Sequence, residues 1–235
     1  MILATLASLP LVFMSCASTG PYPEGFSVPA FPDSENYAEP VLTQAQRLIV
    51  DGGKSLVGKP KLVVNGVTYP NDCSGLARAA YAFAGIDLAY RASELGGGVR
   101  GIYAALSDLN LIYAVRYPEP ADLVFWDDTW DANGNGVADD KLTHVGVVIS
   151  VEEDGTISYL HYHYRKGAVI ERMNLLHPDD RTVDELGPVN AFMRMRGSPA
   201  GPGDTAADLF KAFGMGYDLP KEAATLPVAE STPAP

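Results

Sequence analysis

The sequence predicts an α+β domain in which N-terminal helices pack on an antiparallel β-sheet. Between residues 43 and 109, apolar side chains recur at steps of three and four residues, which is typical of helices. Between residues 123 and 195, short apolar runs rich in β-branched residues indicate strands. The turns between these strands are short enough for hairpins, so we expect neighbouring strands to run antiparallel.

The composition is that of one globular domain with tails. The chain has 235 residues, of which 47% are apolar, and this is enough to build a core. The 29 acidic and 17 basic residues give a net charge of −12, and Lys and Arg form no block along the chain. A nucleic-acid partner needs a surface that neutralises phosphates, so we expect no nucleic-acid binding.

The N-terminus predicts export. Residues 1–16 carry no charge and form an apolar run too short to span a bilayer as a helix, so we expect a signal segment. Ser15-Cys16-Ala17 resembles the cleavage site of bacterial lipoproteins. This predicts a lipid on Cys16 that anchors the protein to a membrane, with a location in the cell envelope, at the outer membrane or in the periplasm. The alternative is an apolar N-terminus that is not a signal.

Two elements precede the second cysteine. Residues 17–41 are rich in Pro, Ser, Gly and Tyr and are expected to be a linker. Thr43 can cap a helix that ends near Val57, before a Gly and a Pro that break helices. Three valines around Asn65-Gly66 then predict a short hairpin.

Cys73 stands where a loop becomes a helix. Apolar residues recur at helical steps after it and the run ends at Gly85, which predicts a helix over residues 73–84. The free N–H groups of the first turn and the helix dipole favour an anion, so we expect a nucleophilic thiol with a lowered pKa. A lipid on Cys16 would leave Cys73 without an intramolecular partner, whereas without the lipid a Cys16–Cys73 disulfide remains an alternative. Another alternative is a buried cysteine that only packs.

The second half of the domain is expected to consist mainly of strands. A third helix, over residues 99–109, comes first. The predicted strands cover residues 123–126, 144–151, 156–163, 168–170 and 189–195, with a turn at Asp154-Gly155. The domain is expected to span residues 42–197. Residues 198–235 are expected to be a tail rich in Pro and Ala, with a short helix over residues 207–213 and disorder from Leu219.

The four histidines include candidates for a catalytic base. His144 opens a strand directly after a loop, so its ring can stand at the edge of the sheet and face the start of the Cys73 helix. His161 and His163 lie on one face of the next strand, where antiparallel pairing can bring either ring to His144. His177 lies in a polar loop and is expected to be solvated. A cysteine hydrolase needs such a base and a third polar group that orients it.

Four motifs follow one another along residues 43–195. They are Asp72-Cys73-Ser74-Gly75-Leu76, Ala121-Asp122-Leu123-Val124-Phe125-Trp126, Thr143-His144-Val145-Gly146-Val147-Val148, and Tyr159-Leu160-His161 with Lys166-Gly167-Ala168-Val169. In this order they resemble the motifs of the NlpC-type family of papain-like bacterial cell-wall peptidases. The resemblance implies a papain-like (NlpC-type) fold. It also implies a cysteine endopeptidase that hydrolyses peptidoglycan stem peptides, commonly between D-γ-glutamyl and the diamino acid.

The resemblance also implies a role for each catalytic residue. Cys73 would be the nucleophile, His144 the base and His161 the orienting group. The register to Gly167 selects His161 over His163. The backbone N–H of Cys73 would contribute to an oxyanion hole, and no cofactor is implied for catalysis.

The substrate pocket departs from the family pattern. Asp72 and Ser74 match positions that line the pocket for the stem peptide and can hold its free amine. Members usually carry a Tyr-x-Trp-Gly-Gly segment before the cysteine motif, and residues 61–69 contain no such segment. Tyr69 is a candidate replacement for that tyrosine.

A polar insertion between two predicted strands offers a calcium site. Asp131, Asn133 and Asn135 place oxygen atoms at loop positions one, three and five, followed by a glycine at six. The further candidate ligands are Val137 through its carbonyl, Asp139 and Asp140, and Asp127, Asp128 or Asp140 could replace the acid that is missing at position twelve. Such an ion would be structural, and the alternative is a plain polar loop. Zinc is a weaker alternative at the histidines, because His161 and His163 form a poor ligand pair.

Two other functions remain open. One is an amidase or acyltransferase that acts on another amide or ester in the same fold. The other is a non-catalytic lipoprotein that binds the cell wall. The presence of Cys73, His144 and His161 argues against the second, because a pure binder does not need all three.

Overall fold

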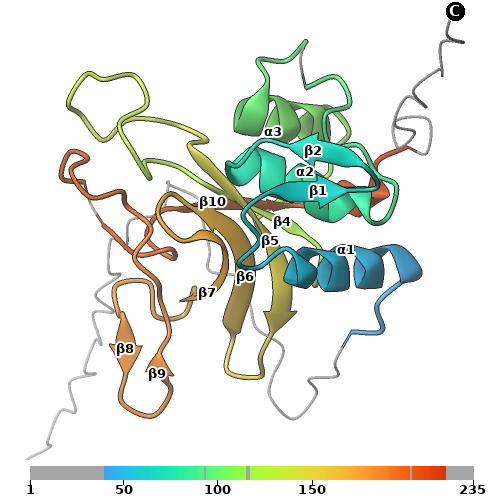
Figure 1. Ribbon diagram of the computed structural model, residues 1–235. Helices are drawn as coiled ribbons and strands as arrows, with labels where there is room; N and C mark the ends of the chain where they lie inside the picture. Colours follow the sequence, from blue (N-terminus) through green and yellow to red (C-terminus); the bar gives the residue numbers. More distant parts are fainter. Residues whose placement is uncertain (1–39, 93, 115–116, 202, 221–235) are drawn as a thin grey trace, which may run out of the picture.

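Figure 1 shows the fold in a computed structural model, which describes residues 40–92, 94–114, 117–201 and 203–220. The chain forms an α+β domain with an antiparallel central sheet, as predicted. The predicted signal segment, the lipidated Cys16 and nearly all of the linker lie outside these ranges, as does the tail from residue 221. None of the helices within the described ranges is long and apolar enough to cross a membrane.

The helices predicted in the first half of the domain are confirmed. They are α1 (Gln44–Ser55), α2 (Cys73–Ala82) and α3 (Gly98–Asp108). Thr43 caps α1 because its side chain accepts from the N–H of Gln46 at 3.2 Å, while the Gln46 side chain accepts from the N–H of Thr43 at 2.9 Å. The chain leaves α2 through Gly85, whose φ of 72° suits glycine.

The predicted hairpin before α2 is also confirmed. It consists of β1 (Leu62–Val64) and β2 (Val67–Tyr69). Asn65 and Gly66 form its turn with φ angles of 52° and 79°, and positive values at both positions are what a type I′ turn requires. The hairpin packs on α2 and so covers the helix that carries Cys73.

Six strands form the central sheet, in the spatial order β3-β10-β4-β5-β6-β7. They are β3 (Ile112–Tyr113), β4 (Leu123–Trp126), β5 (His144–Val151), β6 (Thr156–His163), β7 (Gly167–Asn174) and β10 (Phe210–Gly214). Every neighbouring pair is antiparallel. The strands β4, β5 and β6 have the predicted bounds, and β7 continues beyond its predicted end at residue 170.

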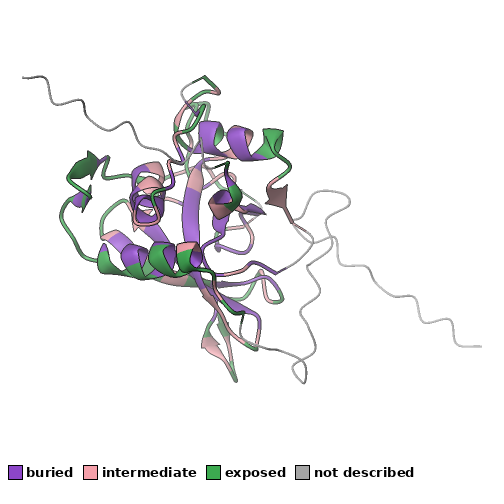
Figure 2. Cartoon of the chain, turned by 90° about the vertical axis from the view of Figure 1, so that its right-hand side faces the viewer, coloured by how far each residue is buried: buried purple, intermediate pink, exposed green. Residues whose placement is uncertain are grey.

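Both faces of the central sheet are covered. On one face α1 and α2 pack against β5, and a core cluster that includes Leu76 and Val145 fills the space between them. On the other face, Trp126 and Tyr159 belong to a second cluster with Phe210. Figure 2 shows the result, with buried strands in the centre and exposed residues on the outer sides of the helices. Because both faces are buried, β4 is apolar at all four positions instead of alternating.

The C-terminal segment corrects the predicted domain boundary. The predicted helix over residues 207–213 is wrong, because β10 lies there and pairs with β3 and β4. The domain therefore extends past residue 197, and Leu219, where disorder was expected to begin, packs in the core with 7% exposure. Without β10, one edge of β4 would be left with unpaired backbone groups, and this pairing outweighs the local helix propensity.

The predicted strand over residues 189–195 is wrong as well. The short hairpin of β8 (Thr182–Val183) and β9 (Gly187–Pro188) precedes this segment. Among the described residues, this segment forms one isolated β-bridge, between Phe192 and Thr205. The side chain of Asn190 takes over much of the pairing, since it donates to the carbonyls of His177 and Asp180. Side-chain bonds of this kind compete with a regular ladder.

Candidate active site

Cys73 is presented by the first turn of α2. The Asp72 carboxylate caps this helix, because its Oδ1 atom accepts from the N–H of Gly75 at 2.7 Å and from the Ser74 hydroxyl at 2.8 Å. A Cβ atom at position 75 would lie 2.0 Å from the carbonyl oxygen of Pro70, so only glycine fits there. The motif around the cysteine therefore builds a tight helix entry that fixes the position of Cys73.

The Cys73 thiol is free and lies beside the start of β5. The backbone N–H groups of Val145, Ser74 and Cys73 favour the thiolate and so lower its pKa. Burial nevertheless raises the pKa of the Cys73 thiol to about 11, and the charge of Asp72 adds to the rise. The expected lowering of the thiol pKa is therefore wrong, because the loss of water around the sulfur outweighs the helix N-terminus. At neutral pH the thiol keeps its proton and depends on a base.

His144 and His161 meet as predicted. Nε2 of His144, the first residue of β5, lies 3.0 Å from Nδ1 of His161 on β6. The two rings stand edge to face, with centroids 5.2 Å apart, and the Trp126 ring packs against His144 at 5.6 Å. Cys73 and His144 line the same cleft, and the backbone N–H of Val145, the residue directly after His144, lowers the pKa of the Cys73 thiol. The thiol and the candidate base are therefore neighbours.

Glu171 continues this row of polar groups, and the sequence analysis missed it. Its Oε2 atom lies 3.0 Å from Nε2 of His161, and its Oε1 atom accepts from the Lys166 ammonium at 3.0 Å. A period-two signal could have found this residue. Val169 pairs with His161 across β6 and β7, and Glu171 is the next residue on the same face of β7.

Burial and neighbouring charges set the protonation of the row. Burial lowers the pKa of His144 well below its ordinary value of 6.5, and His161 lowers it further. Burial opposes the ionisation of Glu171, but hydrogen bonds from His161 and Lys166 outweigh it and lower the pKa of Glu171 to about 2. At neutral pH, the row therefore has a neutral base at the thiol end and a carboxylate at the far end.

The other two histidines have local roles. Nδ1 of His163 accepts from the backbone N–H groups of Arg165 and Lys166 at 3.1 and 3.3 Å, so this side chain stabilises the turn between β6 and β7. Nδ1 of His177 lies 3.8 Å from Oδ2 of Asp180. The His177 side chain is 36% exposed, which agrees with the prediction of a solvated side chain. Across the described residues, no three His, Cys, Asp or Glu side chains gather as a metal site, which gives the zinc alternative no support.

A cleft of about 1150 Å³ opens over Cys73, His144 and His161. We call these three residues and Glu171 the floor. The cleft is bounded by the insertion between β4 and β5 and by the segment after β9. We call these two segments the walls and define them as residues 127–143, 189–201 and 203–204. Besides Cys73, His144 and His161, residues that line the cleft include Asp72, Arg100, Trp130, Tyr164, Phe192 and Arg196.

The predicted pocket residues fall into two groups. Asp72 lines the cleft as predicted. Ser74 does not appear among the residues that line it, and its hydroxyl is bound to Asp72. Tyr69 is buried, with 5% exposure, below the guanidinium of Arg78 at 5.7 Å from its ring centre. The wall residues, and not Tyr69, therefore occupy the rim of the cleft near the thiol.

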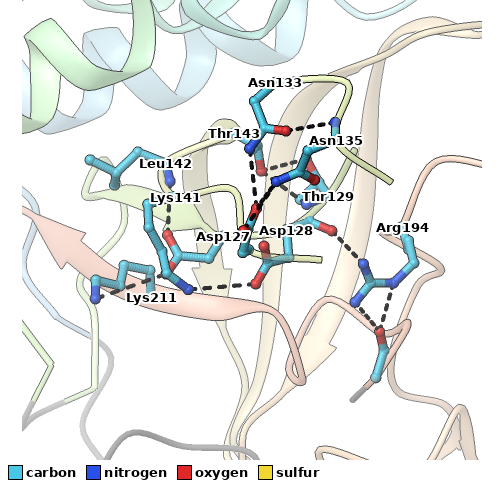
Figure 3. Close-up of polar contacts among 12 residues, drawn as sticks. Asp127, Asp128, Thr129, Asn133, Asn135, Lys141, Leu142, Thr143, Arg194 and Lys211 are labelled. Atoms are coloured by element: carbon cyan, nitrogen blue, oxygen red, sulfur yellow. Dashed lines mark hydrogen bonds and ion pairs between the residues drawn. The ribbon is translucent and has the colours of Figure 1, made fainter. Parts of the chain in front are cut away.

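The base of the insertion is held by a polar network, which Figure 3 shows. The Lys141 ammonium lies 3.5 Å from a carboxylate oxygen of Asp127 and 3.6 Å from one of Asp128. The Asp127 carboxylate also accepts from the N–H of Leu142 at 2.8 Å. Arg194, from the other wall, donates to the backbone carbonyl of Asp128 at 2.8 Å. The network therefore ties the two walls to each other.

The tip of the insertion contains the predicted calcium ligands. Asp131 accepts from the N–H groups of Gly134 and Gly136 at 2.7 and 3.0 Å, and the side-chain oxygens of Asn133 and Asn135 also accept from backbone N–H groups. Asp139 accepts from both asparagine side chains, and Asp140 accepts from the N–H of Ala132. Val137 is exposed at the tip. The loop is folded by its own oxygen atoms, and calcium binding stays a prediction.

Comparison with known proteins finds no matching family model, no matching curated protein and no matching solved structure. The residues of the cleft and their chemistry are therefore what indicates a function. A half-buried thiol, a neutral imidazole near it and a second imidazole behind that are the parts that cysteine hydrolases use.

Proposed function

We propose that the protein is a cysteine peptidase of papain-like, NlpC-type fold that hydrolyses peptidoglycan stem peptides. Cys73 acts as the nucleophile, His144 as the base and His161 as the group that orients His144. The observation that carries this proposal is the 3.0 Å contact between the two imidazoles, next to a thiol at a helix N-terminus and under an open cleft. We further propose that the protein acts in the cell envelope, anchored through a lipid on Cys16.

The protonation states favour a general-base mechanism. The thiol of Cys73 is protonated at neutral pH and His144 is neutral, so His144 takes the thiol proton as the sulfur attacks the scissile carbonyl. The backbone N–H of Cys73, at the open end of α2, stabilises the oxyanion. His144 then gives its proton to the leaving amine. Water hydrolyses the acyl-enzyme with His144 again as the base, which restores the thiol.

The cleft suits a charged peptide. Asp72 lines the cleft next to Cys73, and its carboxylate can pair with the free amine of a stem peptide. The cleft also carries the exposed cations Arg100 and Arg196, although the chain as a whole has a net charge of −12. These cations favour a substrate that bears carboxylates, as stem peptides do. The bond proposed for cleavage lies between D-γ-glutamyl and the diamino acid.

Digestion of purified peptidoglycan tests this function directly. The wild-type protein is expected to release stem-peptide fragments that mass spectrometry of the muropeptides identifies, and Cys73→Ala is expected to release none. Cys73→Ser is the matched control. It replaces the thiol by a hydroxyl of similar size, so it should retain the fold and have little activity. Equal release by wild type and Cys73→Ala would show that Cys73 is not the nucleophile.

The apolar part of the cleft favours one second candidate. Trp130 and Phe192 are exposed beside the cleft, at 42% and 49%, and could hold an acyl group. The same floor would then act as an amidase or acyltransferase on another amide or ester. Turnover of simple acyl esters that depends on Cys73, without release of muropeptides, would favour this candidate over the peptidase.

A further inference from the structure

Behind the two imidazoles lies a carboxylate that the proposed triad does not use. Glu171 stands on β7, one strand beyond His161, and its two oxygen atoms face different partners. Oε2 lies 3.0 Å from Nε2 of His161, and Oε1 lies 3.0 Å from the Lys166 ammonium. The His161 ring is only 3% exposed, so water does not compete strongly for its nitrogen atoms.

This arrangement determines which nitrogen atom of each ring carries a proton. A carboxylate only accepts hydrogen bonds, so Nε2 of His161 must donate to Glu171. In the neutral ring, Nδ1 of His161 is then an acceptor and must receive its bond from Nε2–H of His144. Nδ1 of His144 is left without a proton. This is the nitrogen that has to accept the proton of the Cys73 thiol.

We propose that Glu171 is a positioning residue that sets the tautomers of both histidines, and that Lys166 holds its carboxylate in place. The row then reads Cys73, His144, His161, Glu171 and Lys166, in order from the nucleophile outward. The inference rests on the proposed cysteine chemistry and adds to it. When His144 becomes positively charged in the reaction, the half-buried carboxylate at the far end stabilises that charge through His161.

The variant Glu171→Gln distinguishes this role from simple packing. The carboxamide has nearly the shape of the carboxylate, but Lys166 can only donate and so attracts the amide oxygen. The NH₂ group is then turned toward Nε2 of His161. This reverses every hydrogen bond of the row and leaves a proton on Nδ1 of His144. A histidine base held in the wrong tautomer loses most of its activity.

We expect Glu171→Gln to lower kcat by about 100-fold with little change in KM, because the wrong tautomer affects proton transfer and not binding. The double variant Glu171→Gln/Lys166→Met removes the ammonium. The side-chain amide can then rotate so that its oxygen again accepts from His161, and part of the lost kcat should return. The matched control is Glu152→Gln, which breaks a surface pair with Arg172 at 3.6 Å on the same part of the sheet. It should leave kcat unchanged.

Two readouts need no substrate and so separate this inference from the proposed function. The ¹⁵N chemical shifts of the His161 ring should show Nε2–H in the wild type and Nδ1–H in Glu171→Gln. The rate at which iodoacetamide alkylates Cys73 at pH 7 should fall in Glu171→Gln and recover in the double variant. An unchanged tautomer together with unchanged alkylation would overturn the role of Glu171. If both change while no peptidoglycan is cleaved, the role stands and the proposed function fails.

Discussion

The floor and the walls of the cleft are built in different ways. The floor residues come from regular elements, since Cys73 opens α2 and the other three lie on β5, β6 and β7. The walls are irregular, and their positions depend on side-chain bonds such as those of Arg194. The difference indicates that the chemistry is held rigidly by the sheet, whereas the shape of the substrate site depends on loops.

The largest effect is expected from the floor. His161→Ala removes the group that orients His144 and should lower kcat by about 100-fold. His163→Ala is the matched control, because its ring is 6.2 Å from that of His161 and serves the β6–β7 turn. Its kcat should stay within about threefold of the wild type. Steady-state kinetics on muropeptides measures kcat for both variants. A larger loss of kcat in His163→Ala than in His161→Ala would show that His163 is the orienting residue.

The pH dependence tests the protonation states of the floor. The pKa of the Cys73 thiol is about 11, so its thiolate fraction should rise about tenfold per pH unit from pH 7 upward. Alkylation of unliganded Cys73 should follow this rise. An enzyme that rests as a thiolate and imidazolium pair would instead be alkylated at a nearly constant rate over that range. A plateau in alkylation between pH 6 and 9 would therefore contradict the neutral resting state.

The same groups determine how stability depends on pH. His144 has a pKa below its ordinary value of 6.5 in the folded state, so stability is lost as pH falls below 6.5. The pKa of Glu171 is lowered from 4.5 to about 2 in the folded state. Its contribution to stability is therefore present above pH 4.5 and is lost as the pH falls toward 2. The pKa of Cys73 is raised from 9.0 to about 11, so stability is lost as pH rises above 9.0. Melting temperatures should therefore form a plateau between these limits.

A smaller effect on chemistry is expected from the walls. Arg194 is 8% exposed and donates to the carbonyls of Gly203 and Asp128 and to the carboxylate of Asp204. Arg194→Met should lower the free energy of unfolding by about 2 kcal/mol, because buried acceptors lose their partner. It should raise KM severalfold and leave kcat nearly unchanged. Arg196→Met, on the same segment but exposed, is the control for the free energy of unfolding, and an equal loss of stability in both variants would show that Arg194 does not brace the walls.

The contrast between floor and walls also explains what the sequence could predict. The strand β5 is a nearly continuous apolar run, the histidines of β6 recur with a period of two, and the Asp154-Gly155 turn joins the two strands. Their bounds and the meeting of His144 with His161 were therefore predictable from local patterns. The position of β10 depends on pairing with β4, which is far away in the sequence. No local pattern contains that information, and the helix propensity around it pointed to the wrong element.

The thiol pKa illustrates the same limit at a single atom. The helix N-terminus at Cys73 is visible in the sequence and predicts a lowered pKa. The burial that reverses the shift comes from packing against β5, whose residue Val145 contacts the thiol from a distant part of the chain. Glu171 was missed for a related reason, because the predicted strand ended at residue 170, whereas pairing with β6 extends β7 to Asn174 and places Glu171 beside His161.

The smallest effect is expected at the tip of the insertion. If the loop that begins at Asp131 binds calcium, an excess of calcium over chelator should raise the melting temperature by a few degrees, because a ligand that binds only the folded state stabilises it. Asp131→Ala should abolish this shift. Asp51→Ala, an exposed acid on α1, should preserve it. The loop leads directly into β5, but the side-chain hydrogen bonds of its candidate ligands stay within residues 131–140. Calcium should therefore change kcat far less than KM. An identical melting curve with and without calcium would identify the loop as a polar turn held by its own side chains.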